Sequence, residues 1–257
     1  MKSILNNFLN IFVLKELIDI LTAFLYTFFM NALNIVMISV LGSLLLIFSL
    51  GMVILHALQE NKAHNLNILN RFSEKGQIVF LGDSLTDFFP VQEFFSGMHI
   101  YNRGIANDKT TDVLKRINNV TDIAPSKLFL LIGTNDLGSR VPLEKIMHNI
   151  NEIIELIKKP NPNVKIYVIS QTPINRRAKF FTSFFCLFRT NTKLLALSML
   201  EKDYCDKHGY TFINVWDGLT DSQGNLKKEY TIEGLHLSMS GYRVISKIIK
   251  PYVMQAD

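Results

Sequence analysis

The sequence predicts an α/β fold in which helices cover both faces of buried parallel strands, with a transmembrane helix in front of it. Two observations support this prediction. Beyond Lys75, short β-branched or apolar runs alternate with longer amphipathic segments, as in βαβ units. Before Lys75 lies a long apolar stretch. A chain of 257 residues with 48% hydrophobic residues can build one domain with a sizeable core.

The apolar stretch predicts a transmembrane helix over about residues 35–55. No charged residue occurs in Ile20–Leu55, and about 20 apolar residues in a helix match the roughly 30 Å hydrocarbon core of a bilayer. Residues 18–33 leave two alternatives open: a second short span, with Asn31 and Asn34 as a turn, or an interfacial helix. Nothing in the stretch resembles the cleavage site of a signal peptide.

These patterns divide the chain into three parts. Residues 1–58 form a membrane segment, residues 59–75 a polar, Asn-rich linker that is helical or irregular, and residues 76–257 the α/β domain. In that domain we expect five strands and four longer helices. The strands are Ile78–Leu81, His99–Tyr101, Leu128–Ile132, Lys165–Ile169 and Phe212–Val215, and the helices are Thr110–Val120, Pro142–Lys158, Thr192–His208 and Ser240–Val253.

The composition restricts the partners. A net charge of +5 would suit an anionic surface such as membrane lipid or wall polymer, although scattered Lys and Arg residues usually form a solvated face. We expect no nucleic-acid partner. Cys186 and Cys205 lack His or Cys neighbours at metal-ligand spacing, which argues against a zinc site. The two could pair or remain buried thiols, and we expect unpaired thiols.

The first strand leads directly into a candidate nucleophile, Ser84. In an open parallel sheet, ligands bind beyond the carboxyl ends of the strands, and the N–H of a serine placed there can help to bind the oxyanion formed on an ester carbonyl. A helix-capping serine is the other interpretation. Thr86 stands where the nucleophile elbow of α/β-hydrolases requires glycine, which argues against that fold.

Two further strand ends supply candidate oxyanion donors. After the third strand, Gly133 permits close backbone approach, and the side-chain amide of Asn135 can point its N–H groups into the same crevice. After the second strand, Gly104 could present its backbone N–H, although a glycine there is more often a turn residue.

A histidine near the C-terminus completes the set. His236 follows Glu233 by three residues. A carboxylate at that spacing can hold one imidazole nitrogen while the other accepts the serine proton. The alternative is a surface loop with an incidental histidine.

Together these motifs resemble the SGNH/GDSL hydrolases over about Gly76 to Val253. The four blocks occur in family order: Gly82-Asp83-Ser84-Leu85, Gly104, Gly133-Thr134-Asn135-Asp136 and His236. The runs Asn102-Arg103-Gly104-Ile105 and Tyr230-Thr231-Ile232-Glu233-Gly234-Leu235-His236 are most similar to the bacterial platelet-activating-factor acetylhydrolase-like esterase branch.

The resemblance implies a flavodoxin-like three-layer α/β/α sandwich with about five parallel strands. It makes Ser84 the nucleophile and His236 the general base. The oxyanion hole would consist of the Ser84 N–H, the Gly104 N–H and the Asn135 amide. No metal or cofactor is expected.

One residue departs from the family pattern. The family usually has Asp three residues before the histidine, where this chain has Glu233. A longer carboxylate must fold back to accept the imidazole N–H, so Asp217 and Asp221 are substitutes for the acid.

The resemblance implies a membrane-anchored serine esterase or acylhydrolase that cleaves short-chain acyl esters, such as acetyl esters, or lipid esters through an acyl-serine intermediate. Two alternatives stay open: an O-acyltransferase acting on a cell-surface glycan, and a catalytically idle membrane-tethered binding module. The expected partners are a small ester, lipid or glycan-ester substrate and membrane lipid.

At the cell membrane, a single span with its N-terminus inside would place the domain outside, where wall or lipid esters are accessible. A two-span hairpin would return the domain to the cytoplasm. The charges on the two sides of the apolar stretch do not decide between them. We favour the extracytoplasmic arrangement.

The segment Asn175–Arg189 follows the fourth strand and contains five phenylalanines and four basic residues. This composition predicts either a wall of the acyl pocket or a lid whose basic side chains bind lipid phosphates. Packing of these phenylalanines in the core is the alternative.

Overall fold

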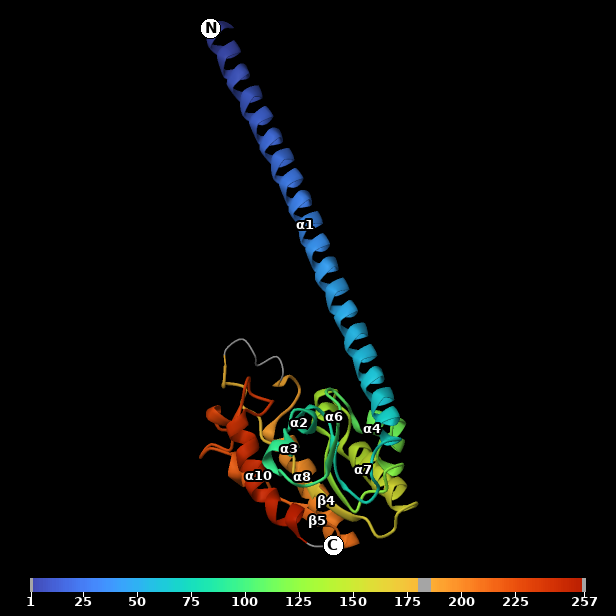
Figure 1. The fold of residues 1–257 in the computed structure, drawn as a ribbon. Helices are drawn as coiled ribbons and strands as arrows, with labels where there is room; N and C mark the ends of the chain where they lie inside the picture. The colour runs from blue at the N-terminus through green and yellow to red at the C-terminus, as the bar shows by residue number, and fades with distance from the viewer. Residues whose placement is uncertain (1, 180–185, 256–257) are drawn as a thin grey trace. The chain divides into compact units, whose positions relative to one another are not determined.

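The computed structural model describes residues 2–179 and 186–255, with side chains from residue 15 onward. The chain forms two compact units, Met1–Ala57 and Leu58–Asp257 (Figure 1). The first unit is helical throughout its described length, and the second contains the sheet and the candidate site.

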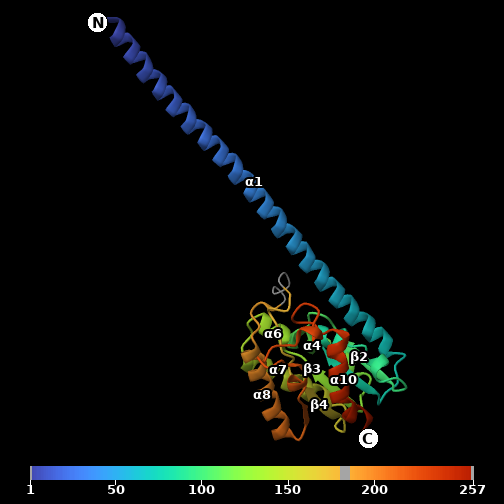
Figure 2. The ribbon, with the colours of Figure 1, turned by 90° about the vertical axis from the view of Figure 1, so that its left-hand side faces the viewer.

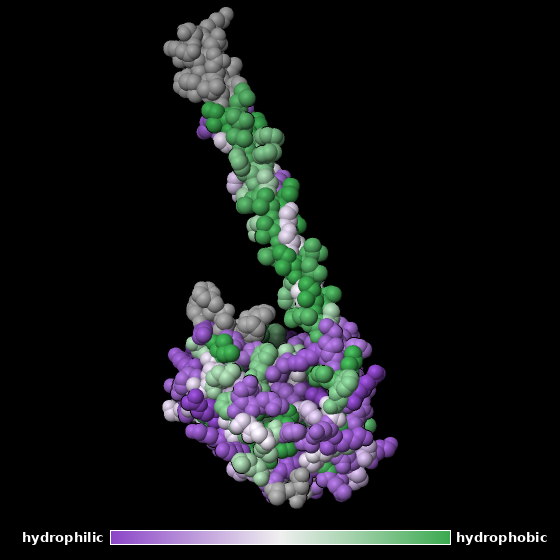
Figure 3. All heavy atoms as spheres, in the orientation of Figure 1, coloured by the Kyte–Doolittle hydropathy of each residue, from purple (hydrophilic) through white to green (hydrophobic). Residues whose placement is uncertain are grey.

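Helix α1 (Lys2–Asn70) continues without a break through Asn31 and Asn34, where a hairpin would need a turn. Its large apolar side chains are exposed, for example Ile38 at 71% and Leu46 at 72%, and Figure 3 shows this apolar surface along the helix. Exposed apolar area of this extent marks an interaction surface. By length and composition α1 can cross a membrane, so it is a candidate membrane anchor.

Residues 59–70 of the predicted linker form the last turns of α1, which is the helical one of the two alternatives. Six residues in its last turns are at least partly buried, and they recur at spacings of three and four: Gln59, Lys62, Ala63, Leu66, Asn67 and Asn70. Such spacing places them on one helix face. Segment 59–70 is therefore a helix with one face packed on its own unit, because these side chains contact the domain rather than water.

Five parallel strands form the sheet, in the order β2-β1-β3-β4-β5. This order is the flavodoxin-like one and confirms the predicted fold class. The strands begin and end within three residues of their predicted positions. Their bounds are β1 Ile78–Gly82, β2 Ile100–Gly104, β3 Lys127–Leu131, β4 Lys165–Ile169 and β5 Thr211–Ile213.

Helices connect the strands. The predicted helix Thr110–Val120 is wrong in its continuity: it forms two short helices, interrupted at Arg116, whose guanidinium group is buried against Asp108. The helices of the domain are α2 Ser84–Asp87, α3 Val91–Phe94, α4 Thr110–Lys115, α5 Asn118–Thr121, α6 Thr134–Gly138, α7 Leu143–Lys158, α8 Asn191–His208, α9 Trp216–Leu219 and α10 Met239–Met254.

Alternating strand side chains build a core on each face of the sheet. Val79 packs in the cluster that includes residues of α7 and α8, whereas Phe80 packs in the cluster that includes α10. Figures 1 and 2 show the resulting three layers, with the sheet between the helices. Cys186 and Cys205 lie in the first cluster as free, buried thiols, as expected.

Candidate active site

The predicted nucleophile lies at the carboxyl end of β1. Asp83 caps the short helix α2, its Oδ1 accepting the Leu85 N–H at 2.9 Å, which leaves Ser84 as the first residue of that helix. The Ser84 Oγ lies 2.9 Å from His236 Nε2. None of the hydrogen bonds found in the described part of the chain uses the Ser84 N–H, so this group remains available to an incoming oxyanion.

Glu233 holds the other side of the imidazole. Its Oε1 lies 2.7 Å from His236 Nδ1 and accepts the His236 backbone N–H at 2.8 Å. Burial alone would raise the pKa of Glu233, but these hydrogen bonds outweigh burial and keep the pKa below its usual value. An ionised Glu233 fixes Nδ1 as the protonated nitrogen, so Nε2, which lies against Ser84 Oγ, is the nitrogen that accepts the serine proton.

The two substitute acids have other partners. Asp217 accepts a hydrogen bond from Asn214, and Asp221 accepts the N–H groups of Gln223 and Asn225. Of the three candidate carboxylates, the structure brings Glu233 to the histidine.

The loop around Gly234 explains how the longer acid reaches its target. Gly234 has a φ of +112°, and a Cβ there would lie 2.3 Å from the Asn175 carbonyl oxygen. Thr231 Oγ1 accepts the Gly234 N–H and donates to the His236 carbonyl oxygen, both at 2.8 Å. The loop is thereby tightly closed, and Glu233 folds back onto His236.

The Asn135 amide is held in one orientation. Its Nδ2 donates to the Asp108 carbonyl oxygen at 2.9 Å, and its Oδ1 accepts from Arg189 Nη2 at 2.8 Å. Arg189 Nε also donates to the Thr134 carbonyl oxygen at 3.0 Å. Because an amide nitrogen carries two protons, one N–H of Asn135 remains for an oxyanion.

Gly104 allows β2 and α2 to approach closely, and its N–H is hydrogen-bonded within the chain. Its N–H donates to Asn102 Oδ1 at 2.8 Å, and a Cβ at Gly104 would lie 2.3 Å from the Asp87 nitrogen. Glycine is therefore required for the close approach of β2 to α2. The single proton of the Gly104 N–H is thus engaged within the described chain, whereas the Asn135 amide keeps a second N–H beside the one donated to Asp108.

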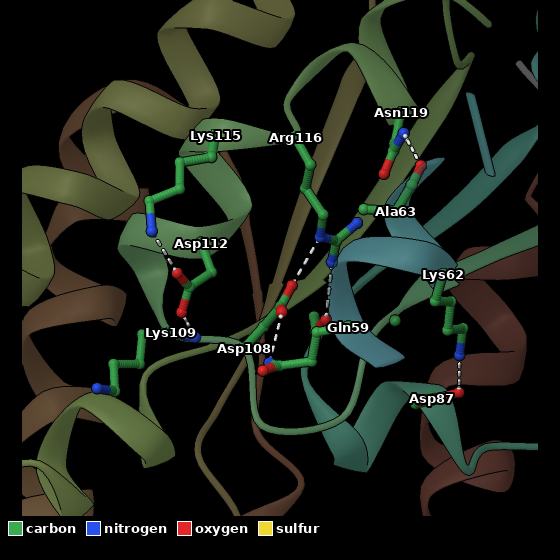
Figure 4. A network of polar contacts seen from close by, with 12 residues as sticks. Gln59, Lys62, Ala63, Asp87, Asp108, Lys109, Asp112, Lys115, Arg116 and Asn119 are labelled. Carbon is green, nitrogen blue, oxygen red and sulfur yellow. Dashed lines mark hydrogen bonds and ion pairs between the residues drawn. The ribbon is translucent and has the colours of Figure 1, made fainter. Parts of the chain in front are cut away.

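Two buried carboxylates brace the loops that carry Asn135. Asp136 accepts the Thr110 N–H at 3.0 Å and the Thr110 hydroxyl at 2.6 Å. Asp108 Oδ2 pairs with Arg116 Nε at 2.6 Å (Figure 4). The Asp136 contacts join the segments after β2 and β3. The Arg116 contact holds Asp108, whose carbonyl oxygen orients Asn135.

Asp83 is a buried carboxyl beside the nucleophile. It is 1% exposed, and its Oδ2 has no hydrogen-bond partner in the described structure. Burial raises its pKa to about 7, although the Leu85 N–H and the nearby His236 and Arg189 act in the opposite direction. Near neutral pH this group is therefore partly protonated.

Some functional residues were not identified from the sequence. Arg189 lies in the segment predicted as a lid, and Asp108 and Arg116 belong to none of the sequence motifs. Phe88, also missed, lies 5.4 Å from the His236 ring between centroids and is 48% exposed, which gives the site an apolar edge. Phe184 and Phe185 of the predicted lid lie outside the described residues.

Comparison with known proteins identifies the family. The model of the GDSL-like lipase/acylhydrolase family matches residues 80–244. A Streptococcus pneumoniae structure named for platelet activating factor is 35% identical, with a TM-score of 0.71, and the match covers 76% of this chain and 92% of that one. A GDSL-like lipase from Bacteroides thetaiotaomicron shares the fold at 21% identity, with a TM-score of 0.66 and coverage of 74% and 96%.

Among curated proteins, subunit alpha2 of rat platelet-activating factor acetylhydrolase IB is 26% identical over 198 residues, covering 75% of this chain and 82% of the relative. The family match spans well over half of the chain and contains the Ser84, Asn135 and His236 positions. The chain therefore belongs to the GDSL-like lipase/acylhydrolase family of ester hydrolases.

Proposed function

We propose that this protein is a membrane-anchored serine esterase with Ser84 as nucleophile, His236 as general base and Glu233 as the acid that orients it. The observation that carries this proposal is the continuous set of contacts from Ser84 Oγ to His236 Nε2 at 2.9 Å and from His236 Nδ1 to Glu233 Oε1 at 2.7 Å. This is the arrangement that activates a serine for acyl transfer.

In the first half-reaction, Ser84 Oγ attacks the ester carbonyl carbon and its proton passes to His236 Nε2. The negative charge on the carbonyl oxygen is stabilised by the Ser84 N–H and the remaining Asn135 N–H. His236 then gives the proton to the leaving alcohol. In the second half-reaction, water attacks the acyl-serine with His236 as base, and the carboxylic acid is released.

The substrate we propose is a short-chain acyl ester, such as an acetyl ester, or a lipid ester. The rat relative's name refers to acetyl hydrolysis, and Phe88 offers an apolar surface beside His236. The apolar helix α1 supports residence at the cell membrane, with residues 1–58 as the membrane segment and the catalytic domain outside the cytoplasm. Membrane lipid is then a direct neighbour of the enzyme.

The test is hydrolysis of p-nitrophenyl esters from acetyl to palmitoyl by the full chain in detergent, beside its Ser84→Ala variant. We expect turnover that Ser84→Ala abolishes, with a chain-length preference that identifies the acyl group. Time courses with added alcohol acceptors distinguish water from a glycan hydroxyl as the acyl acceptor. A folded protein without Ser84-dependent turnover would contradict the proposal and favour an idle binding module.

A further inference from the structure

We propose that the last turns of α1 belong to the catalytic unit, with Gln59 and Lys62 as positioning residues for the oxyanion donors. This inference rests on the proposed roles of Ser84 and Asn135. It concerns residues 58–70, which lie in the same compact unit as the site.

The far end of this segment is fixed to the domain independently of Gln59 and Lys62. Leu66 is 7% exposed. Asn70 Nδ2 donates to the Asn118 carbonyl oxygen at 3.2 Å, and Asn70 Oδ1 accepts from Arg103 at 2.8 Å. Asn119 donates to the Ala63 carbonyl oxygen at 3.1 Å (Figure 4). The helix is therefore a rigid support from which side chains nearer the membrane segment can act.

Gln59 reaches the loop after β2. Its Nε2 donates to the Ala106 carbonyl oxygen at 3.0 Å and to Asp108 Oδ1 at 3.3 Å. The backbone carbonyl of Asp108 accepts the Asn135 amide at 2.9 Å. Asp108 therefore contacts both Gln59 of α1 and the Asn135 side chain, which is proposed to bind the oxyanion.

Lys62 reaches the helix that begins with the nucleophile. Its Nζ forms an ion pair with Asp87 Oδ1, and the other oxygen of Asp87 accepts the Ala106 N–H at 2.9 Å. Asp87 is the last residue of α2, whose first residue is Ser84. One carboxylate therefore joins α1, the nucleophile helix and the loop that Gln59 also holds.

Both contacts come from residues within seven positions of Leu55, the end of the uncharged stretch. The positions of the oxyanion donors of Ser84 and Asn135 thus depend on residues that directly follow the apolar segment in the sequence. A displacement of about 1 Å in catalytic groups lowers rates by up to roughly 100-fold, so we expect loss of the Gln59 contacts to act on the chemical step.

The experiment uses the full chain in detergent with p-nitrophenyl acetate. We expect Gln59→Leu to lower kcat roughly 10-fold or more with KM changed less than about 2-fold, because a donor acting in the transition state is displaced. Gln59→Ala and Lys62→Met should lower kcat in the same way. The matched control is Asn65→Ala, at an exposed position in the same turns of the helix, which should leave kcat unchanged.

A double-mutant cycle separates positioning from general destabilisation. In an Asn135→Ala background, Gln59→Leu should have little further effect on kcat. Equal effects of Gln59→Leu in both backgrounds, an unchanged kcat, or an equal loss in Asn65→Ala would overturn the inference. Retention of activity in Ser84→Ala would instead refute the proposed function, so the two failures are distinguishable.

Discussion

At the scale of single residues, Arg189 and Asn135 show how one side chain can set the orientation of another. The guanidinium group donates to Asn135 Oδ1 and to the Thr134 carbonyl oxygen, so the Asn135 amide cannot rotate to exchange its oxygen and nitrogen without losing a charge-assisted hydrogen bond. Loss of one oxyanion donor costs about 100- to 1,000-fold in kcat.

We therefore expect Asn135→Ala to lower kcat by about 100- to 1,000-fold. Arg189→Met should produce a smaller loss of the same kind, because the amide loses the partner of its oxygen and is held only by its hydrogen bond to the Asp108 carbonyl oxygen. Steady-state kinetics of the single and double variants measures this. Independent, additive losses would show that Arg189 does not act through Asn135.

Asp83 should make stability depend on pH. Its pKa is raised from 3.8 to about 7 in the folded chain, so the folded state binds this proton more tightly than the unfolded state does. Stability from this group is present below about pH 4 and is lost as the pH rises towards about 7, by an amount on the order of 4 kcal/mol.

Asp83→Asn keeps an acceptor for the Leu85 N–H and removes the titration. We expect it to raise the melting temperature relative to the parent chain more at pH 8 than at pH 5. Asp122→Asn, at an exposed aspartate of the same domain, is the control and should show no such difference. A pH-independent effect of Asp83→Asn would argue against a buried titrating carboxyl.

At the scale of elements, the strands and the longer helices were predictable because each depends on a local pattern. Buried parallel strands appear as apolar runs, and α7 and α8 begin and end within one residue of their predicted positions. The packing of the end of α1 against the domain is hard to predict, because the packed helix face consists mainly of polar residues. The spacing of Gln59, Lys62 and Leu66 was the available signal.

The turn from β3 into α6 depends on Gly133. It has a φ of +126°, and a Cβ there would lie 2.8 Å from Leu197 Cδ2. We expect Gly133→Ala to destabilise the domain by about 3 kcal/mol or more, from backbone strain and the clash together. Denaturant unfolding measures the loss.

Gly209 provides a matched control for that substitution. It also has a positive φ, of +69°, but nothing lies within 4 Å of the position that an alanine methyl group would occupy there. Gly209→Ala should cost only about 1 kcal/mol. Equal losses for the two variants would show that close packing at Gly133 is unimportant.

At the scale of the whole molecule, α1 should determine where the enzyme resides. Its apolar side chains between Leu17 and Leu58 are exposed, and removing them from water favours insertion into lipid. We expect the full chain to stay in the membrane pellet after alkaline carbonate extraction. A chain beginning at Leu58 should be released into the soluble fraction, whereas release of the full chain would contradict membrane anchoring.

The site residues that could be predicted from the sequence either follow the end of a strand or lie a few residues from another site residue. Ser84 and Asn135 follow strands, and Glu233 lies three residues before His236. Arg189 acts on Asn135 across 54 positions of sequence. Such a contact leaves no local pattern, so only the folded chain reveals it.

Covalent labelling of the full chain with a fluorophosphonate, followed by peptide mass mapping, tests directly whether Ser84 is the nucleophile. We expect one label, on Ser84, with a labelling rate that falls strongly in His236→Ala because the serine loses its base. Labelling of another residue, or an unchanged rate in His236→Ala, would contradict it.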